Sequence, residues 1–193
     1  MRHGWQWDEW SYGYNDSRNS LGEIYRHSPD HVKGLLDLPM ISTPGTTYAY
    51  STIASVALGA VVESSAAIQL EDFAEQYLFE PIGITTAIWA YTPVGRAHTG
   101  GGLWLGQRDM AKFGQLYLNK GVWLGQQLIS KEWIELSTQR HVSFNYGHSD
   151  GYGYQWWTKR FVLSDGSQID TFSAQGNGGQ FIYVIPAFNA IVV

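Results

Sequence analysis

The chain has 193 residues, of which 44% are hydrophobic, so it is long enough to bury the core of one domain or of a large part of one. The formal net charge is -5 and the 12 lysines and arginines are scattered singly, which leaves no basic face for a phosphate backbone, so we expect no nucleic-acid partner. The absence of cysteine excludes disulfides, thiolate metal sites and a cysteine nucleophile.

Both ends of the chain predict a fragment. The first ten residues contain no charged segment followed by an apolar one, so we expect no secretory signal. The last residues, NAIVV, end inside an apolar strand-like run that would normally continue or pair. The longest apolar run, residues 53–62, is well short of the ~20 residues of a membrane-spanning helix, so no membrane span is expected.

The first elements are irregular. Residues 1–48 are rich in Trp, Tyr, Asn, Ser and Pro, which predicts loops and one short helix at residues 30–36. From residue 53 onward apolar side chains recur at i, i+3, i+4, i+7 and i+8, and Ser51 or Thr52 can serve as N-cap, which predicts a helix. Leu58 and Val62 lie outside this stripe and are also apolar, so we expect the helix to be buried in the core.

Three further helices are predicted. The first covers residues 70–78 and is stopped by Pro81 and Gly83. The second covers residues 109–120, where an acidic first turn and a Lys-Gly end agree with the helix dipole. The third begins at Ser130, which is a favourable N-cap.

From residue 151 onward the hydrophobic period becomes two, which predicts an antiparallel meander. Its strands are expected at residues 152–157, 168–174, 181–185 and 191–193. Because helices come first and strands last, the predicted fold class is α+β, with an antiparallel sheet packed against helices. We expect residues 1–193 to form one domain or a partial domain, with helices and loops in residues 1–150 and the sheet in residues 151–193.

Two motifs suggest chemistry but fail on their context. GHSDG at residues 147–151 matches the G-x-S-x-G nucleophile elbow, which needs a strand before it, a helix after it and a later His. An aromatic strand follows instead and no His lies beyond His148, so we interpret the motif as a turn. His27 and His31 have the spacing of zinc ligands on a helix, but Pro29 lies between them, which favours a surface loop.

Two other features have plain structural explanations. The glycines at residues 100–102 fit neither the dinucleotide-binding nor the phosphate-binding pattern and predict a tight turn. Nothing sets Asp8 and Glu9 apart as an acid/base pair, so we expect both carboxylates to be solvated. No metal site and no cofactor is expected.

Two segments leave alternatives open. In QGNGGQ, residues 175–180, glycines at the start of a strand would weaken it, and one reason for them is to let a ligand approach the backbone. The N–H of Gln180 could then donate to a carbonyl oxygen that becomes an oxyanion. A hairpin turn before Gln180 explains the glycines equally well. Tyr50, just before a helix, is either a packing residue or a phenol that moves a proton.

Three segments together resemble one superfamily. They are Tyr50-Ser51-Thr52, GGGLWLGQRDMAKFGQLYLN at residues 100–119, and QGNGGQFIYVIP at residues 175–186. In this order, along nearly the whole chain, they are similar to the serine β-lactamases and penicillin-binding proteins, nearest to the class C and esterase branch. The resemblance implies a β-lactamase/transpeptidase-like fold, truncated at both ends, and a periplasmic or secreted location.

The family acts through a Ser-x-x-Lys nucleophile, a Tyr-x-Asn element and a Lys-Thr-Gly-like strand, with an acyl-serine intermediate. The resemblance therefore implies Tyr50 as base or proton relay and the N–H of Gln180 as oxyanion donor. It implies Thr52 and the Asn177-Gly178-Gly179 segment as substrate contacts. A phenol with a pKa near 10 can act in this way only if cations nearby favour the phenolate.

The chain departs from the family pattern at three places. Each of its lysines has a residue other than Ser three positions earlier, so Ser-x-x-Lys is absent, and we expect the nucleophile to lie outside the chain. Thr52 stands where Asn is usual, and Asn177 where Lys or His is usual. Both changes favour an uncharged ester or simple amide over a β-lactam as substrate.

The sequence therefore predicts part of a serine hydrolase that is inactive by itself and acts on a small-molecule ester or amide. The alternative is a catalytically inactive binding or regulatory protein with the same fold. A carbohydrate-binding module, indicated only by the 15% aromatic content, is a third hypothesis. Truncation would leave an exposed sheet edge, through which copies of the chain could associate.

Overall fold

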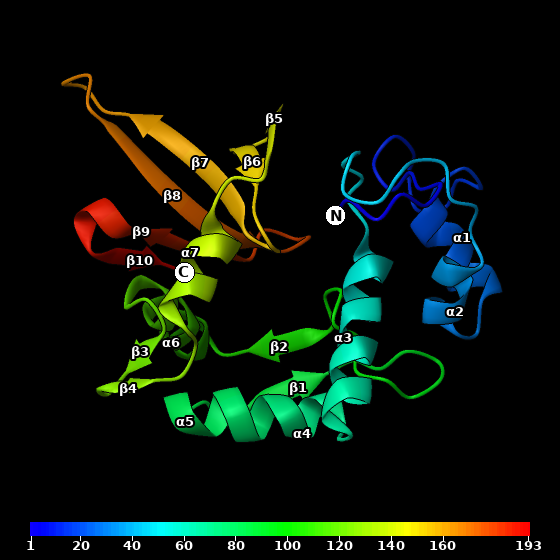
Figure 1. Ribbon diagram of the computed structural model, residues 1–193, viewed down its shortest axis with the longest axis horizontal. Helices are drawn as coiled ribbons and strands as arrows, with labels where there is room; N and C mark the ends of the chain where they lie inside the picture. Colours follow the sequence, from blue (N-terminus) through cyan, green and yellow to red (C-terminus); the bar gives the residue numbers. More distant parts are fainter. The chain divides into compact units, whose positions relative to one another are not determined.

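The computed structural model describes residues 1–193, except for the side chains of Asn145 and Tyr146. By its internal contacts the chain divides into two compact units (Figure 1). Unit 1 comprises Met1–Glu75 and Ala87–Trp104, and unit 2 comprises Gln76–Thr86 and Leu105–Val193.

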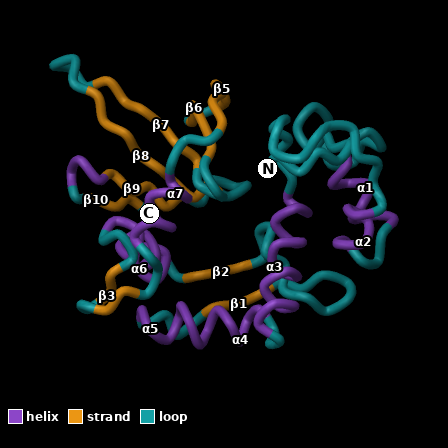
Figure 2. Tube along the Cα trace, in the orientation of Figure 1, coloured by secondary structure: helices purple, strands orange, loops and turns teal.

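Unit 1 is mainly helical, and loops join its helices (Figure 2). Its helices are α1 (Ser20–His27), α2 (His31–Leu36), α3 (Thr52–Ala66) and α4 (Leu70–Ala74). The predicted short helix at residues 30–36 is confirmed as α2, whose N-cap Asp30 accepts hydrogen bonds from two backbone N–H groups. Helix α1 was not predicted, although Asn19 caps it in the same way.

Helix α3 begins where the sequence predicts, but it is not buried on all sides. Ile53 and Val56 are buried and belong to the core of unit 1, together with Trp7, Leu21, Ile24 and Leu35. The helix therefore contributes to the core as predicted, but Leu58 is 55% exposed and Val61 is 59% exposed, so the expected burial of these two side chains was wrong. The buried face also carries the small residues Ser55 and Gly59, which bring a neighbouring loop close to the helix.

The predicted helix at residues 70–78 is longer than expected and changes geometry within its length. Helix α4 continues into a π-helical turn, η1 (Glu75–Phe79), and then into α5 (Glu80–Ile82). Pro81 lies inside this continuous helical segment, so the prediction that it helps to stop the helix was wrong. It has no N–H to donate within the helix, and it directly follows the π-helical turn. Gly83, with φ +71°, ends the segment, as predicted.

The antiparallel meander of unit 2 is confirmed. Its six strands follow the order β10-β9-β8-β7-β6-β5 (Figure 1), and all of their pairings are antiparallel. Their bounds are β5 (Val142–Tyr146), β6 (Ser149–Tyr152), β7 (Trp157–Val162), β8 (Gln168–Gln175), β9 (Phe181–Ile185) and β10 (Ala190–Val192). The sheet thus begins before residue 151. Its outer strands are β5 and β10, and association of copies through these edges stays a prediction.

The expected strand at residues 152–157 is wrong in detail. Tyr152 ends β6, Trp157 begins β7, and the residues between them turn the chain, with Gln155 at φ +66°. The neighbouring GHSDG motif spans the turn between β5 and β6 and then continues into β6. Because a strand and not a helix follows Ser149, the structure agrees with a turn and excludes a nucleophile elbow.

Two helices of unit 2 follow the predictions. Helix α6 (Gln107–Leu118) contacts β9 and β10, and Gly114 allows the close approach, because a Cβ there would lie 2.9 Å from Ile182 and Ile191. Helix α7 (Lys131–Thr138) is capped by Ser130, whose Oγ accepts from the N–H of Trp133. The core between them contains Tyr117, Ile134 and Trp156, with Phe113 and Phe172 packed against it.

The remaining strands form two short pairs. These pairs are β1 (Ala87–Trp89) with β2 (Leu103–Leu105) and β3 (Val122–Trp123) with β4 (Gln126–Gln127). Among the described residues, no single helix is long and apolar enough to cross a membrane. Helix α3 and the helical segment Leu70–Ile82 meet the length and composition criteria only as a pair, which is bent by 80°.

The turns around β3 provide a matched test of backbone constraint. Gly121 has φ +84°, and a Cβ there would lie 1.9 Å from the carbonyl oxygen of Ile129, whereas Gly125 has φ +83° and open space around it. We expect Gly125→Ala to lower the free energy of unfolding by about 1 kcal/mol from backbone strain alone. Gly121→Ala adds a clash and should cost about 3 kcal/mol or more. Chemical denaturation of both variants measures this, and equal losses would contradict it.

Candidate active site

Tyr50 lies directly before the first turn of α3. Its ring is half-buried and stacks on Trp10, with ring centroids 5.1 Å apart and an interplanar angle of 21°. The next residue, Ser51, is fully buried and caps α3, because its Oγ accepts from the N–H of Ala54 at 3.0 Å. Tyr50 is thus held by a ring contact on one side and by a rigid helix start on the other.

Glu9 contacts the same helix start, which the sequence analysis missed. Its side chain is only 5% exposed, so the expectation of a solvated carboxylate was wrong for Glu9. The N–H of Thr52 donates to Oε2 at 2.8 Å, and Oγ1 of Thr52 donates to Oε1 at 2.5 Å. The positive end of α3 and an N–H with no partner inside the helix offset part of the cost of burying a carboxylate there.

The electrostatic surroundings of Tyr50 disfavour its phenolate. Burial, the Glu9 carboxylate and Tyr14 together raise the pKa of Tyr50 to about 12. Burial, Tyr50 and Glu9 also raise the pKa of Tyr48. Burial raises the pKa of Glu9 itself, although its bonds from Thr52 oppose this effect. A role for Tyr50 as a base therefore requires a cation that outweighs Glu9.

The loop at residues 98–102 packs against the same end of α3. The N–H of Gly102 donates to the carbonyl of His98 at 2.7 Å, so the predicted tight turn is confirmed. Oγ1 of Thr99 donates to the carbonyl of Ser55 at 2.8 Å. A Cβ on Gly100 would lie 2.6 Å from the carbonyl oxygen of Thr52, so this glycine also permits close contact with the helix.

The second predicted site segment forms the hairpin between β8 and β9 in unit 2. The N–H of Gly176 donates to the carbonyl of Gln180 at 2.9 Å, and Gly178 and Gly179 have φ +112° and +90°. The glycines thus have a structural reason, which was one of the two alternatives. Asn177 and Gln180 are exposed. The proposed roles of these residues, and of Tyr50 and Thr52, stay predictions.

The histidines of the weak zinc motif lie on different helices. His27 ends α1 and lies 3.6 Å from Oε2 of Glu23, whereas His31 begins α2 and is buried. The expectation of a surface loop was therefore wrong. Within the part of the chain that the structure describes, no group of three or more His, Asp or Glu residues could hold a metal ion.

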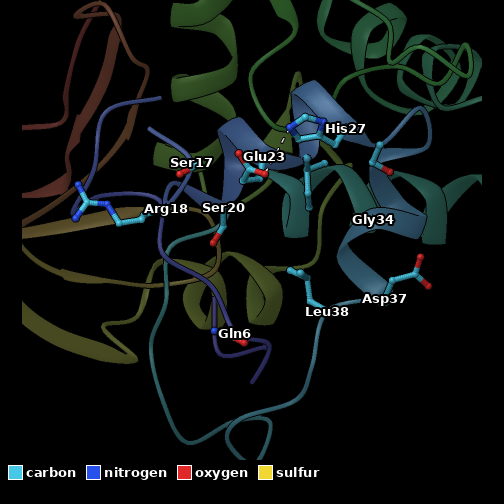
Figure 3. Close-up of a pocket in the computed structure, with 11 residues that line it drawn as sticks. Gln6, Ser17, Arg18, Ser20, Glu23, His27, Gly34, Asp37 and Leu38 are labelled. Atoms are coloured by element: carbon cyan, nitrogen blue, oxygen red, sulfur yellow. Dashed lines mark ion pairs between the residues drawn. The ribbon is translucent and has the colours of Figure 1, made fainter. Parts of the chain in front are cut away.

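Unit 1 also contains a groove. It has a volume of about 510 Å³ and is lined by residues of α1, α2 and nearby loops, among them Arg18, Glu23 and Asp37 (Figure 3). Neither Tyr50 nor Thr52 lines it. The arrangement around the start of α3 therefore stays the stronger candidate site.

The α+β fold, with helices beside an antiparallel sheet, is that of the β-lactamase/transpeptidase-like class. The sequence model of the family described as Beta-lactamase matches residues 5–193. The chain therefore belongs to the beta-lactamase family. A comparison with curated protein sequences finds no match.

Solved structures show the same fold. A putative 6-aminohexanoate-dimer hydrolase from Bacillus anthracis is similar over 96% of this chain and 50% of its own, with a TM-score of 0.74 and 22% identity. A penicillin-binding protein from Bacillus halodurans is similar over 95% of this chain and 64% of its own, with a TM-score of 0.61 and 17% identity. A D-amino acid amidase from Ochrobactrum anthropi SV3 is similar over 95% of this chain and 62% of its own, with a TM-score of 0.59 and 13% identity. The chain thus spans between half and two thirds of these structures.

The burial of Glu9 predicts a particular dependence of stability on pH. The folded chain holds the Glu9 proton more tightly than the unfolded chain, because the folded pKa is raised above 4.5. This group therefore favours folding at low pH, and its contribution falls as the pH rises above that value. The free energy of unfolding of the wild type, relative to Glu9→Gln, should decrease between about pH 4 and about pH 7.

Glu23→Gln is the matched control for this titration, because Arg26 lowers the pKa of Glu23 in the folded chain. Glu23 therefore stabilises the fold at neutral pH, and this stabilisation is lost as the pH falls. The pH dependence is opposite in sign to that of Glu9. Chemical denaturation across the pH range measures both. A wild-type advantage over Glu9→Gln that grows toward neutral pH would show that the carboxylate is not destabilised by burial.

Proposed function

We propose that the chain is part of a serine hydrolase that cleaves an ester or an amide through an acyl-serine intermediate. The observation that supports this most is the Tyr50-Ser51-Thr52 element, fixed at the start of α3 by Ser51 and Glu9, in a chain of the beta-lactamase family. Because Ser-x-x-Lys is absent from the 193 residues, the nucleophile is proposed to come from outside them.

In this proposal Tyr50 takes the proton of the attacking serine as the serine oxygen bonds to the substrate carbonyl carbon. The carbonyl oxygen becomes an oxyanion, to which the N–H of Gln180 donates. Tyr50 then returns the proton to the leaving alcohol or amine, and the cycle repeats with water to release the acid. The lysine of the missing Ser-x-x-Lys motif would supply the cation that the raised pKa of Tyr50 requires.

The proposed substrate is an uncharged ester or a simple amide. Asn177 replaces a cation that would meet a substrate carboxylate, and Thr52 presents a hydroxyl in place of an amide. One of the similar structures is an amidase, which agrees with an amide substrate but does not identify it. Gly179 has open space where a Cβ would lie, so the hairpin backbone can be approached at this residue, whereas the Gln180 side chain lies beside Gly178.

Labelling of the protein encoded by the whole reading frame tests this function. We expect a fluorophosphonate to add mass to one serine, and Tyr50→Phe to slow both labelling and ester hydrolysis about 100-fold or more, because the proton acceptor is lost. Tyr77→Phe is the control, because Tyr77 is 55% exposed on the π-helical turn. Mass spectrometry and steady-state kinetics give the readout. An unchanged rate in Tyr50→Phe would exclude the proposed role of Tyr50.

The second candidate is a binding or regulatory protein that keeps the fold and lacks the chemistry. The observation that favours it is the absence of Ser-x-x-Lys from the chain. The same labelling experiment separates the two candidates. A whole protein that lacks the motif and forms no adduct with either a fluorophosphonate or a penicillin would support this candidate over the hydrolase.

A further inference from the structure

We propose that Glu9 is a positioning residue for this reaction, which fixes the Tyr50-Ser51-Thr52 segment through two hydrogen bonds to Thr52. The inference rests on the function proposed above, but its geometric part concerns unit 1 alone. Glu9 does not reach the reacting atoms in this proposal. It acts through Thr52 and through its chain neighbour Trp10.

The two bonds fix the segment in two respects. The bond from the Thr52 N–H to Oε2, at 2.8 Å, anchors the backbone at the first residue of α3. The bond from Oγ1 to Oε1, at 2.5 Å, anchors the side chain of the same residue. These contacts join positions 43 residues apart, so they tie the N-terminal loop to the helix start and not merely one turn to the next.

A purely structural cap does not require this carboxylate. Ser51 already caps α3 through the N–H of Ala54, and a neutral side chain could serve the remaining donor. A carboxylate that is only 5% exposed carries a desolvation cost, which its bonds must offset. Glu9 bonds Thr52, which follows Tyr50 by two residues. Its charge is therefore better explained by the fixing of the Tyr50-Ser51-Thr52 segment than by helix stability alone.

The bond from Oγ1 also determines what Thr52 can offer a substrate. The hydroxyl hydrogen is donated to Glu9, so the oxygen presents only its lone pairs to any other group. An Asn at this position could both donate and accept. Thr52 is therefore restricted to accepting a hydrogen bond, such as one from a substrate N–H, as long as Glu9 holds its hydroxyl.

The loop that carries Glu9 reaches Tyr50 as well. Trp10 follows Glu9 directly, and its ring stacks on Tyr50 and lies 6.3 Å from the ring of Tyr48. Glu9 also acts electrostatically on Tyr25, Tyr48 and Tyr50, where burial and its charge favour the protonated phenols. Displacing this loop would thus change both the position and the protonation of Tyr50.

The test begins with the chain itself and needs no activity. Glu9→Gln keeps the shape of the side chain but removes the charge and one of the two acceptor oxygens, so the N–H and the hydroxyl of Thr52 can no longer donate to separate oxygens. Glu9→Ala removes the bonds as well. Glu23→Gln is the matched control, because it removes a carboxylate from an exposed helix face of the same unit. Tyrosine Cζ resonances, with Tyr50→Phe as the assignment, follow Tyr50 through an alkaline titration.

We expect the Tyr50 resonance to shift in both Glu9 variants, and its pKa to fall in Glu9→Gln because an anion has been removed. Glu23→Gln should leave the Tyr50 resonance and the Tyr50 pKa unchanged. If Glu9→Ala does not fold, Glu9→Gln still decides the question. A folded Glu9→Gln chain whose Tyr50 resonance and titration equal those of the wild type would overturn the proposal.

Kinetics of the whole protein complete the test. We expect Glu9→Gln to lower kcat about 10-fold with KM changed less than about twofold, because a misplaced catalytic group affects the chemical step. The rise of kcat/KM with pH should also move to lower pH. An unchanged pH profile would overturn the proposal. A wild type that never forms an adduct would refute the proposed hydrolase. A Tyr50 resonance that moves further in Glu9→Ala than in Glu9→Gln, which lack the same charge, would still support positioning through the bonds to Thr52.

Discussion

The candidate site depends on one interaction, the burial of the Glu9 carboxylate against the first residue of α3. A helix start has N–H groups without partners and the positive end of a dipole, and both stabilise a nearby anion. At Thr52, the backbone N–H and the side-chain hydroxyl donate to the two oxygens of the Glu9 carboxylate. Tyr50 and Ser51 directly precede Thr52, so this contact constrains them together with the Ser51 cap and the Trp10 ring.

The loop at residues 98–102 constrains the same helix from a different segment of unit 1. Gly100 lies so close to Thr52 that a Cβ would overlap its carbonyl oxygen, and Thr99 donates to Ser55 one turn further on. Glu9 and this loop therefore act on neighbouring turns. The start of α3 is held by contacts from two distant parts of the sequence, which is how a site residue is kept in a single geometry.

The sequence predicted the elements whose signals are local. Ser51, Ser130 and the glycine at position 83 mark helix ends, and the period of two marks the sheet. It could not predict that Glu9 is buried, because its donors lie 43 residues away and no local pattern indicates them. The exposure of Leu58 was missed for the same reason, since which side of α3 is covered depends on the packing of the whole unit.

For glycines, too, the sequence alone does not identify the contact that requires them. Gly178 and Gly179 adopt positive φ in a hairpin, and this use was among the alternatives that the sequence left open. Gly100 is different, because it serves a close approach to α3 that exists only in the folded chain. A glycine-rich segment therefore predicts a backbone constraint but does not say whether a turn, a neighbouring helix or a ligand imposes it.

The charge balance around Tyr50 connects the geometry to the choice of substrate. Raising the pKa of the phenol from 10.0 to about 12 disfavours its phenolate by roughly 3 kcal/mol. A cation about 4 Å away contributes roughly 4 kcal/mol at the effective dielectric of a protein surface, enough to offset this. In the proposed enzyme, one lysine would therefore be used to balance Glu9 and to make Tyr50 a base. The proposed preference for a neutral ester or amide agrees with this balance, because Asn177 stands where the family pattern has a cation.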